Sequence, residues 1–281
     1  MKITDFRVGD ALPEHRSFAQ NGAAHSENKI HDDTVARQYG FSGGLVPGVT
    51  VHAYMTRPLV TAFGRDWVER GTISTRFNKP FYEGGLVTAR AFVTAVSEKG
   101  VEAELQALNE HEDICAVGTA SLPAEAHEAP PPGEFPEASL PAIRPPATAS
   151  ILGEMNVMGS LTQTWDPDQN EAFLDEIEDD LPLWRGPKAV LHPGYLIRFA
   201  NTILVRNVEM GPWIHVSSDV THFRAIPTGV GFTTRGRVLE TFERKGHKFA
   251  VLDVLVATDS GEPAMRARHT AIYEVRKLSN A

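Results

Sequence analysis

The chain has 281 residues, of which 42% are hydrophobic and 22% charged, and its formal net charge is -9 at pH 7. This length allows two domains of ordinary size, and the balance is typical of globular proteins. The negative charge argues against a general nucleic-acid binder, which needs a basic surface. No apolar stretch approaches the ~20 residues of a spanning helix, and the N-terminus lacks a secretory signal, so we expect no membrane partner and a cytoplasmic location.

The first half of the chain predicts one helix followed by a group of strands. Pro47-Gly48 is typical of a turn and a helix start. In the stretch 49–63, Val51, Met55 and Leu59 recur at a spacing of four, which places them on one helical face. Runs rich in β-branched residues, separated by short polar turns, follow at 88–96, 101–108 and 114–122, and they favour antiparallel hairpins.

The clearest boundary in the chain is a proline-rich stretch at 123–146, which includes Pro130-Pro131-Pro132 and Pro145-Pro146. Repeated prolines remove backbone donors and fix φ, so this stretch predicts an extended connector. The domain boundaries that follow are an N-terminal domain at 1–125, a linker at 126–146 and a C-terminal domain at 147–281.

The second half repeats the pattern of helix and strands. It begins with an acidic segment, 166–180, which has eight carboxylates in fifteen residues and no histidine. We expect a solvated helix face or loop there, and no metal site. A helix is predicted over 195–205, where Tyr195, Phe199 and Ile203 share one face. Strands are predicted at 237–242, 249–256 and 265–275.

Landmarks in the two halves recur at one spacing. Pro47 and Pro193 lie 146 positions apart, as do Phe77 and Phe223, and as do Gly100 and Gly246. Self-similarity at so long a period indicates a duplicated domain. One long helix followed by a meander suggests a sheet wrapped around that helix. We therefore predict an α+β protein with a double hot-dog fold, whose two sheets join edge to edge because isolated edge strands are a liability.

The segment before the first helix carries the residues with chemical potential. Asn28, Ile30 and His31 are followed by Asp32 or Asp33, and then by Ala36, Gly40, Phe41 and Gly48. This order resembles the MaoC-like dehydratase family, the hot-dog (R)-specific enoyl-CoA hydratases. The resemblance covers about fifty residues and extends more loosely over 76–85, whereas the second half is matched by its architecture alone.

The segment also departs from the family pattern. The catalytic aspartate of the family lies five residues before its histidine, and Ser26 occupies that position here. Glu27 is one residue nearer, Lys29 replaces a proline, and Pro47 replaces a later histidine. These changes leave the fold inference in place and weaken the hydratase inference.

The resemblance implies hydration of an α,β-unsaturated acyl thioester, or the reverse reaction, with no cofactor. His31 would activate water as the base, because an imidazole has a pKa suited to that task. Asn28 would orient the imidazole or the water, although it could equally cap the local helix. Glu27 would stand in for the missing aspartate. Backbone N–H groups at Gly48 and Val49, where the helix begins, would face the thioester oxygen.

The substrate would be an acyl-CoA or an acyl carrier thioester, which needs an apolar tunnel and a cationic rim. The face of helix 49–63 supplies apolar residues, and Arg37, Arg57 and Arg76 are the expected rim, because guanidinium suits phosphate. The second half has no Asn-x-Ile-His sequence, so we expect it to complete the pocket without catalysing. His192, which precedes Pro193-Gly194, is the expected exception at the pocket mouth.

Two other functions stay open at this point. Hot-dog folds also host thioesterases, in which His31 or Glu27 would activate water for hydrolysis. A non-catalytic acyl-CoA binding module is the alternative of a different class, and the loss of the family aspartate fits it. Fold alone does not decide function. A homodimer also remains open.

Overall fold

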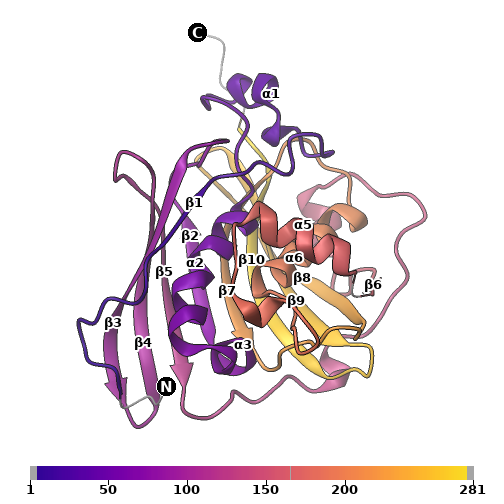
Figure 1. Ribbon diagram of the computed structural model, residues 1–281. Coiled ribbons are helices and arrows are strands. Elements are labelled where there is room, and N and C mark those ends of the chain that lie inside the picture. Colours follow the sequence, from indigo (N-terminus) through magenta and orange to yellow (C-terminus); the bar gives the residue numbers. More distant parts are fainter. Residues whose placement is uncertain (1–4, 165, 277–281) are drawn as a thin grey trace.

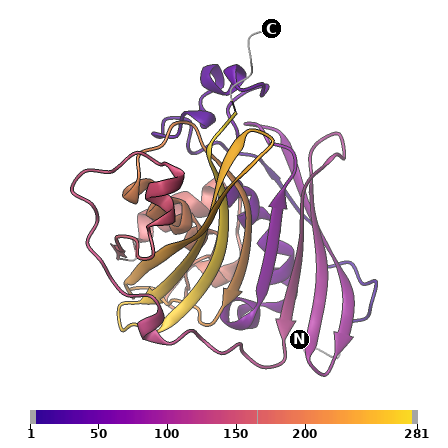
Figure 2. The ribbon, with the colours of Figure 1, turned by 180° about the vertical axis from the view of Figure 1, so that it is seen from behind.

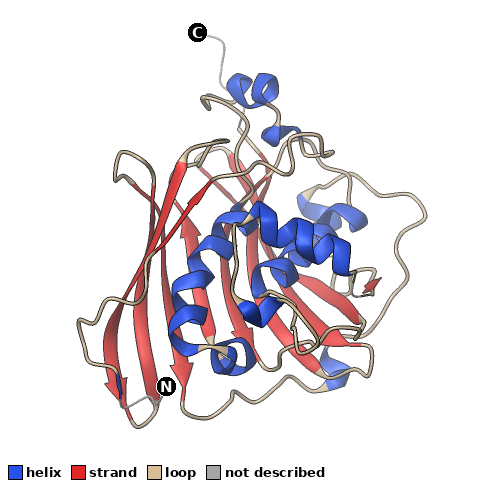
Figure 3. Cartoon of the chain, viewed as in Figure 1, coloured by secondary structure: helices blue, strands red, loops and turns tan. Residues whose placement is uncertain are grey.

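The computed structural model describes residues 5–164 and 166–276. Within these residues ten strands form one antiparallel sheet in the order β1-β3-β4-β5-β2-β7-β10-β9-β8-β6. The sheet curves around helices that lie against one of its faces (Figures 1 and 3). The prediction of an α+β double hot-dog fold is confirmed.

The first half consists of a short edge strand, the segment before the long helix, that helix and a meander. The bounds are β1 His15–Phe18, η2 Lys29–His31, α1 Asp33–Gln38, α2 Gly48–Phe63, α3 Arg65–Arg70, β2 Thr72–Phe77, β3 Leu86–Ser97, β4 Gly100–Leu108 and β5 Ile114–Pro123.

The second half repeats this plan after the linker. The bounds are η3 Pro132–Glu134, α4 Ala149–Gly153, β6 Leu161–Gln163, α5 Pro167–Glu176, η4 Pro182–Trp184, α6 Pro193–Asn207, β7 Ile214–His222, β8 Phe232–Arg244, β9 His247–Thr258 and β10 Pro263–Glu274. Both predicted helices and five of the six predicted strands lie within the elements described above, and the sixth, 265–275, ends one residue beyond β10.

The two halves meet along strands β2 and β7. Thr72 to Arg76 pair antiparallel with Thr221 to Ser217, so the sheet continues from one half into the other. The prediction of an edge-to-edge junction is confirmed. Helices α2 and α6 pack against each other on the inner face of this junction. Met55, Leu59 and Ile203 are fully buried there. None of the helices in the described ranges combines the length and apolar composition needed to cross a membrane.

The proline-rich linker is more closely anchored than a free connector would be. It crosses to the back of the second half (Figure 2), where Phe135 is only 2% exposed. The guanidinium carbon of Arg237 lies 4.9 Å from the centroid of the Phe135 ring. Glu134 pairs with both Arg237 at 2.7 Å and Arg266 at 3.2 Å. The linker is therefore fixed to the outer face of strands β8 and β10.

Candidate active site at the junction of the two halves

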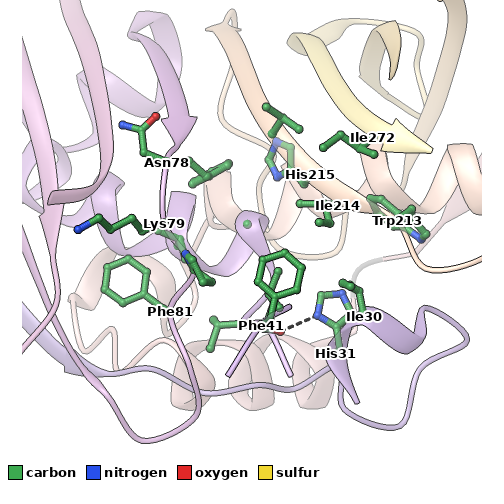
Figure 4. Close-up of a pocket in the computed structure, with 17 residues that line it drawn as sticks. Ile30, His31, Phe41, Asn78, Lys79, Phe81, Trp213, Ile214, His215 and Ile272 are labelled. Atoms are coloured by element: carbon green, nitrogen blue, oxygen red, sulfur yellow. Dashed lines mark hydrogen bonds between the residues drawn. The ribbon is translucent and has the colours of Figure 1, made fainter. Parts of the chain in front are cut away.

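A largely apolar cavity of about 180 Å³ lies where helix α2 begins, between the two halves of the chain (Figure 4). One wall comes from the η2–α1 segment and the start of α2, and the opposite wall comes from β7 and β10. The side chains that matter below are those of His31, Phe41, Phe77, Trp213 and His215, together with the backbone at Gly48.

His31 is held in one tautomer by its backbone contact. Its Nδ1 lies 2.6 Å from the carbonyl oxygen of Leu45. Because a carbonyl can only accept, Nδ1 carries the hydrogen and Nε2 keeps its lone pair. Burial lowers the pKa of His31, against the opposing effect of the Leu45 hydrogen bond. The ring is therefore neutral at pH 7 and available as a base at Nε2.

Asn28 contacts both the imidazole and the second half of the chain. Its Nδ2 lies 3.2 Å from Nε2 of His31 and donates to that lone pair. The same amide nitrogen donates to the carbonyl oxygen of Trp213 at 2.9 Å. Its Oδ1 accepts from the Trp213 N–H at 3.1 Å and caps η2 by accepting from the Ile30 N–H at 3.3 Å. Asn28 thus positions His31 and also serves as the helix cap considered from the sequence.

Helix α2 begins at Gly48, as the sequence predicted, and it points an uncapped N-terminus at the site. Pro47 precedes it, and no side chain of the described residues caps it. Gly48 lines the apolar cavity, and Val49 lines a second cavity that adjoins it. A Cβ on Gly48 would lie 2.8 Å from Nδ1 of His215 and 3.1 Å from the Phe77 ring, so only glycine fits. Such a helix start attracts a partial negative charge.

A second cavity of about 360 Å³ adjoins the first, and His31 and Trp213 line both. Three arginines and two glutamates are among the residues that line this second cavity. Arg198 pairs with Glu176 at 2.5 Å, and Arg144 pairs with Glu27 at 2.9 Å. Arg206, on α6, is exposed beside them. The arginines that surround the site therefore come from the linker and from the second half.

Glu27 and Ser26 both lie in the second cavity, and neither bonds to the imidazole. The Glu27 side chain is 79% exposed, and its carboxylate is held by Arg144. The Ser26 hydroxyl lies 3.4 Å from the carbonyl oxygen of Asn28. Among the residues that the structure describes, no carboxylate hydrogen-bonds to His31. The site thus has a candidate base and no paired acid.

Arg57 requires a correction to the expected phosphate rim. Its guanidinium pairs with Asp179 at 2.8 Å and with Asp180 at 2.7 Å, and its side chain is only 16% exposed. The side chain of Asp179 is almost wholly buried, so part of the acidic segment is core and not a solvated face. Arg57 therefore joins the two halves through a salt bridge.

The other two arginines of the expected rim lie on the first half of the chain. Arg37 pairs with Asp33 at 3.5 Å on α1. Arg76 is exposed on strand β2.

His192 requires a second correction. It is fully buried, with its ring centroid 4.5 Å from that of Trp184 and 5.3 Å from that of Phe173. Its Nδ1 accepts a hydrogen bond from the Gly194 N–H at 2.9 Å and so caps α6. Its Nε2 lies 3.4 Å from Asp179 Oδ2. His192 thus belongs to the core at the start of α6, because the aromatic side chains of the acidic segment and η4 cover it.

Several site residues carried no signal in the sequence. Trp213 and His215 lie outside the resembling segment, and they approach His31 and Gly48 only because β2 pairs with β7. Leu45 contributes a backbone atom, which sequence patterns do not show. Over 5–164 and 166–276, no three His, Cys, Asp or Glu side chains are grouped so as to hold a metal ion.

This chain is similar to known proteins in its structure and not in its sequence. No family model matches the sequence, and no curated protein matches it. A structure from Chloroflexus aurantiacus J-10-fl, described as a MaoC domain protein dehydratase, matches at TM-score 0.69 and 10% identity, with 98% of this chain and 97% of that chain covered. A MaoC-like dehydratase matches at TM-score 0.64 and 9% identity, with 97% and 99% covered.

A conserved hypothetical protein of Mycobacterium tuberculosis, described as having a double hot-dog fold, matches at TM-score 0.61 and 15% identity, with 96% of this chain and 97% of that chain covered. These alignments run over nearly the full length of every chain compared. The protein therefore has the double hot-dog fold of the MaoC-like dehydratase structures.

Proposed function

We propose that this protein processes acyl thioesters, and that its reaction is the hydration of an α,β-unsaturated acyl-CoA, or the reverse dehydration of a 3-hydroxyacyl-CoA. The observation that carries the proposal is a juxtaposition at one apolar cavity. A neutral imidazole, His31, and the uncapped N-terminus of a long helix, at Gly48, both line it. The first can move a proton and the second can bind an oxyanion.

In the proposed reaction His31 acts at Nε2. A water displaces the 3.2 Å contact with the Asn28 amide, and Nε2 takes a proton from that water as its oxygen bonds to the β-carbon. The electrons of the double bond move onto the thioester oxygen, where the backbone N–H groups at the start of α2 meet the developing charge. The imidazolium then delivers its proton to the α-carbon, which restores neutral His31 and completes the addition of H and OH.

The second cavity suits the CoA end of the substrate. It adjoins the apolar cavity at His31, so a thioester that reaches the helix start would leave its CoA arm among Arg144, Arg198 and Arg206. Guanidinium groups suit phosphates because they present paired donors. An acyl carrier thioester presents the same pantetheine chemistry with one phosphate in place of three.

Both the fold and the missing carboxylate bear on which thioester reaction occurs. The likeness to MaoC-like dehydratase structures supports hydration. The absence of a carboxylate bonded to His31 among the described residues makes the binding module the principal competitor. Hydrolysis would use the same cavity with water directed at the carbonyl carbon, so only the products distinguish it from hydration.

The test is incubation with a panel from crotonyl-CoA to dodecenoyl-CoA, with enoyl absorbance and free thiol followed together. Hydration predicts loss of enoyl absorbance with no thiol release. Thiol release would identify a thioesterase. Unchanged substrate, together with saturable binding, would identify a binding module and would contradict the proposed reaction.

A further inference from the structure

The apolar cavity contains a second histidine with an unpartnered nitrogen, and its surroundings suggest a role. His215 is 5% exposed and lines the cavity, and in Figure 4 its ring stands on the other side of the cavity from His31. Within the described residues, its Nδ1 is buried with no hydrogen-bond partner. Buried polar atoms in native proteins are nearly always paired, so an orphan beside a cavity points to a ligand.

Nδ1 of His215 lies close to the start of α2. A Cβ placed on Gly48 would come within 2.8 Å of it, so the imidazole lies directly against the first residue of the helix, and both residues line the cavity. Two observations therefore converge there: an orphan nitrogen on one side, and backbone N–H groups without a capping side chain on the other.

A buried chain of hydrogen bonds holds the ring. Nε2 of His215 lies 2.8 Å from the Ser218 hydroxyl, and that hydroxyl lies 2.9 Å from Nδ1 of His269. The two imidazoles also stack, with centroids 4.1 Å apart. Phe77 packs edge-on against the His215 ring at 4.8 Å. The ring therefore has a fixed orientation in the cavity wall.

The same hydrogen bonds can run in two directions, and each direction corresponds to one tautomer of His215. If Nδ1 of His269 donates to Ser218, and Ser218 donates to Nε2 of His215, the remaining hydrogen of His215 sits on Nδ1, next to the cavity. The opposite order would place the remaining N–H on His269 Nε2, which is buried with no partner among the described residues. Each order thus leaves one N–H without a protein partner, on His215 in the first and on His269 in the second. Only His215 lines the cavity, where a ligand can accept from that N–H, so the first order is the one that a bound ligand completes. Burial and the neighbouring His269 and His52 hold the pKa of His215 well below its usual range, which keeps the ring neutral.

We propose that the Nδ1–H of His215 donates a hydrogen bond to the carbonyl oxygen of the bound thioester, together with the backbone N–H groups at the start of α2. This inference rests on the proposed function and assigns a specific catalytic residue within it. His215 transfers no proton in this role. It stabilises the negative charge that develops on the oxygen, and a neutral imidazole can do so without carrying a charge itself.

The experiment follows the carbonyl directly, with [1-¹³C]butyryl-CoA, a saturated thioester that cannot be hydrated. Infrared difference spectra with the wild-type protein should show the labelled carbonyl stretch shifted to lower frequency than in the free ester. His215→Phe, which keeps a ring but has no donor, should bind the ester within a few-fold of wild type and lose most of that shift. Its kcat for crotonyl-CoA should fall roughly 10²–10³-fold, the usual effect of removing one such donor.

His222→Phe is the matched control, since His222 is another buried histidine of strand β7 and lines neither cavity. It should keep the full shift and the wild-type kcat. Ser218→Ala should reduce the shift in part, because the tautomer is no longer selected, and it carries the test if His215→Phe does not fold. An undiminished shift in both the His215 and the Ser218 variants would overturn the assignment. Failure of the wild-type protein to bind any acyl-CoA would instead overturn the proposed function.

Discussion

Asn28 and Trp213 exchange two hydrogen bonds across the junction of the two halves. The Asn28 amide nitrogen donates to the Trp213 carbonyl at 2.9 Å, and the Trp213 N–H donates to Asn28 Oδ1 at 3.1 Å. The segment that positions His31 is therefore fixed to the second half, although that half has no Asn-x-Ile-His sequence of its own. The second half contributes to the site by holding it together.

Replacing Asn28 should affect both stability and activity. Asn28→Ala leaves the buried N–H and C=O of Trp213 without partners, at a cost of about 1–3 kcal/mol in the free energy of unfolding. Turnover should fall further than this stability loss explains, because His31 loses its contact at Nε2. Urea denaturation and kcat measured on the same samples would check this. A variant with native stability would show that the Asn28–Trp213 bonds contribute nothing.

His31→Ala should lower turnover by roughly 10²–10⁴-fold, the usual effect of losing a general base. Stability should change little, since the ring lies at a cavity. His111→Ala, at a histidine whose side chain is 77% exposed, is the control and should remain fully active. Full activity in His31→Ala would remove His31 from the mechanism.

The pH dependence of the reaction follows from the buried state of His31. Burial lowers its pKa below the usual value of 6.5, so the base form is already dominant at pH 7. In the hydration direction, kcat/KM should be flat near neutrality and decline as the pH falls through a pKa below 6.5. A pH–rate profile over pH 4.5–8 is the measurement. A limb centred above pH 7 would indicate a different group.

If the phosphate site lies in the second cavity, replacing Arg57 should lower stability without changing CoA affinity, and replacing Arg206 should do the reverse. Arg57→Met leaves the buried Asp179 carboxylate without its cation, at a cost of about 3–5 kcal/mol, and should leave the affinity for CoA unchanged. Arg206→Met should preserve the melting temperature and weaken CoA binding, with a smaller salt dependence. Calorimetric titration and thermal melts measure both. The reverse result would restore the rim expected from the sequence.

The buried histidines predict acid sensitivity. Burial lowers the pKa of His52, His222 and His269 to about 3 in the folded protein. The unfolded chain takes up protons below its pKa of about 6.5 while the folded chain does not, so stability falls as the pH drops from about 6.5 toward 3. The slope is at most about 1.4 kcal/mol per pH unit for each histidine. Urea midpoints at pH 7 and pH 5 test this, and His222→Phe should show a flatter dependence. An equal slope in that variant would contradict the assignment.

The sequence was most informative where its patterns are local. Helical periodicity and β-branched runs located α2, α6 and the six long meander strands, and the 146-residue offset indicated the duplication. The motif placed Asn28, His31 and Gly48 together, and the structure brings them to one junction.

The misplaced residues depend on contacts between distant segments. Arg57 was expected in the phosphate rim because its partner, Asp179, lies 122 positions away and the sequence does not show that the two meet. His192 was expected at the pocket mouth, but the side chains of Trp184 and Phe173 cover it. His215 has no local signature, and it approaches Gly48 only through the pairing of β2 with β7. Nothing in the chain order predicts which edges of two duplicated sheets will meet.

The central claim is that the cavities beside His31 bind an acyl thioester, and an equilibrium titration tests it most directly. Crotonyl-CoA and free CoA are added to the wild-type protein at low and at high ionic strength. We expect saturable binding of both, tighter for the ester, with an affinity that weakens as salt rises because arginines hold the phosphates. If neither ligand binds at millimolar concentration, both the enzyme and the binding-module versions of the proposal are wrong.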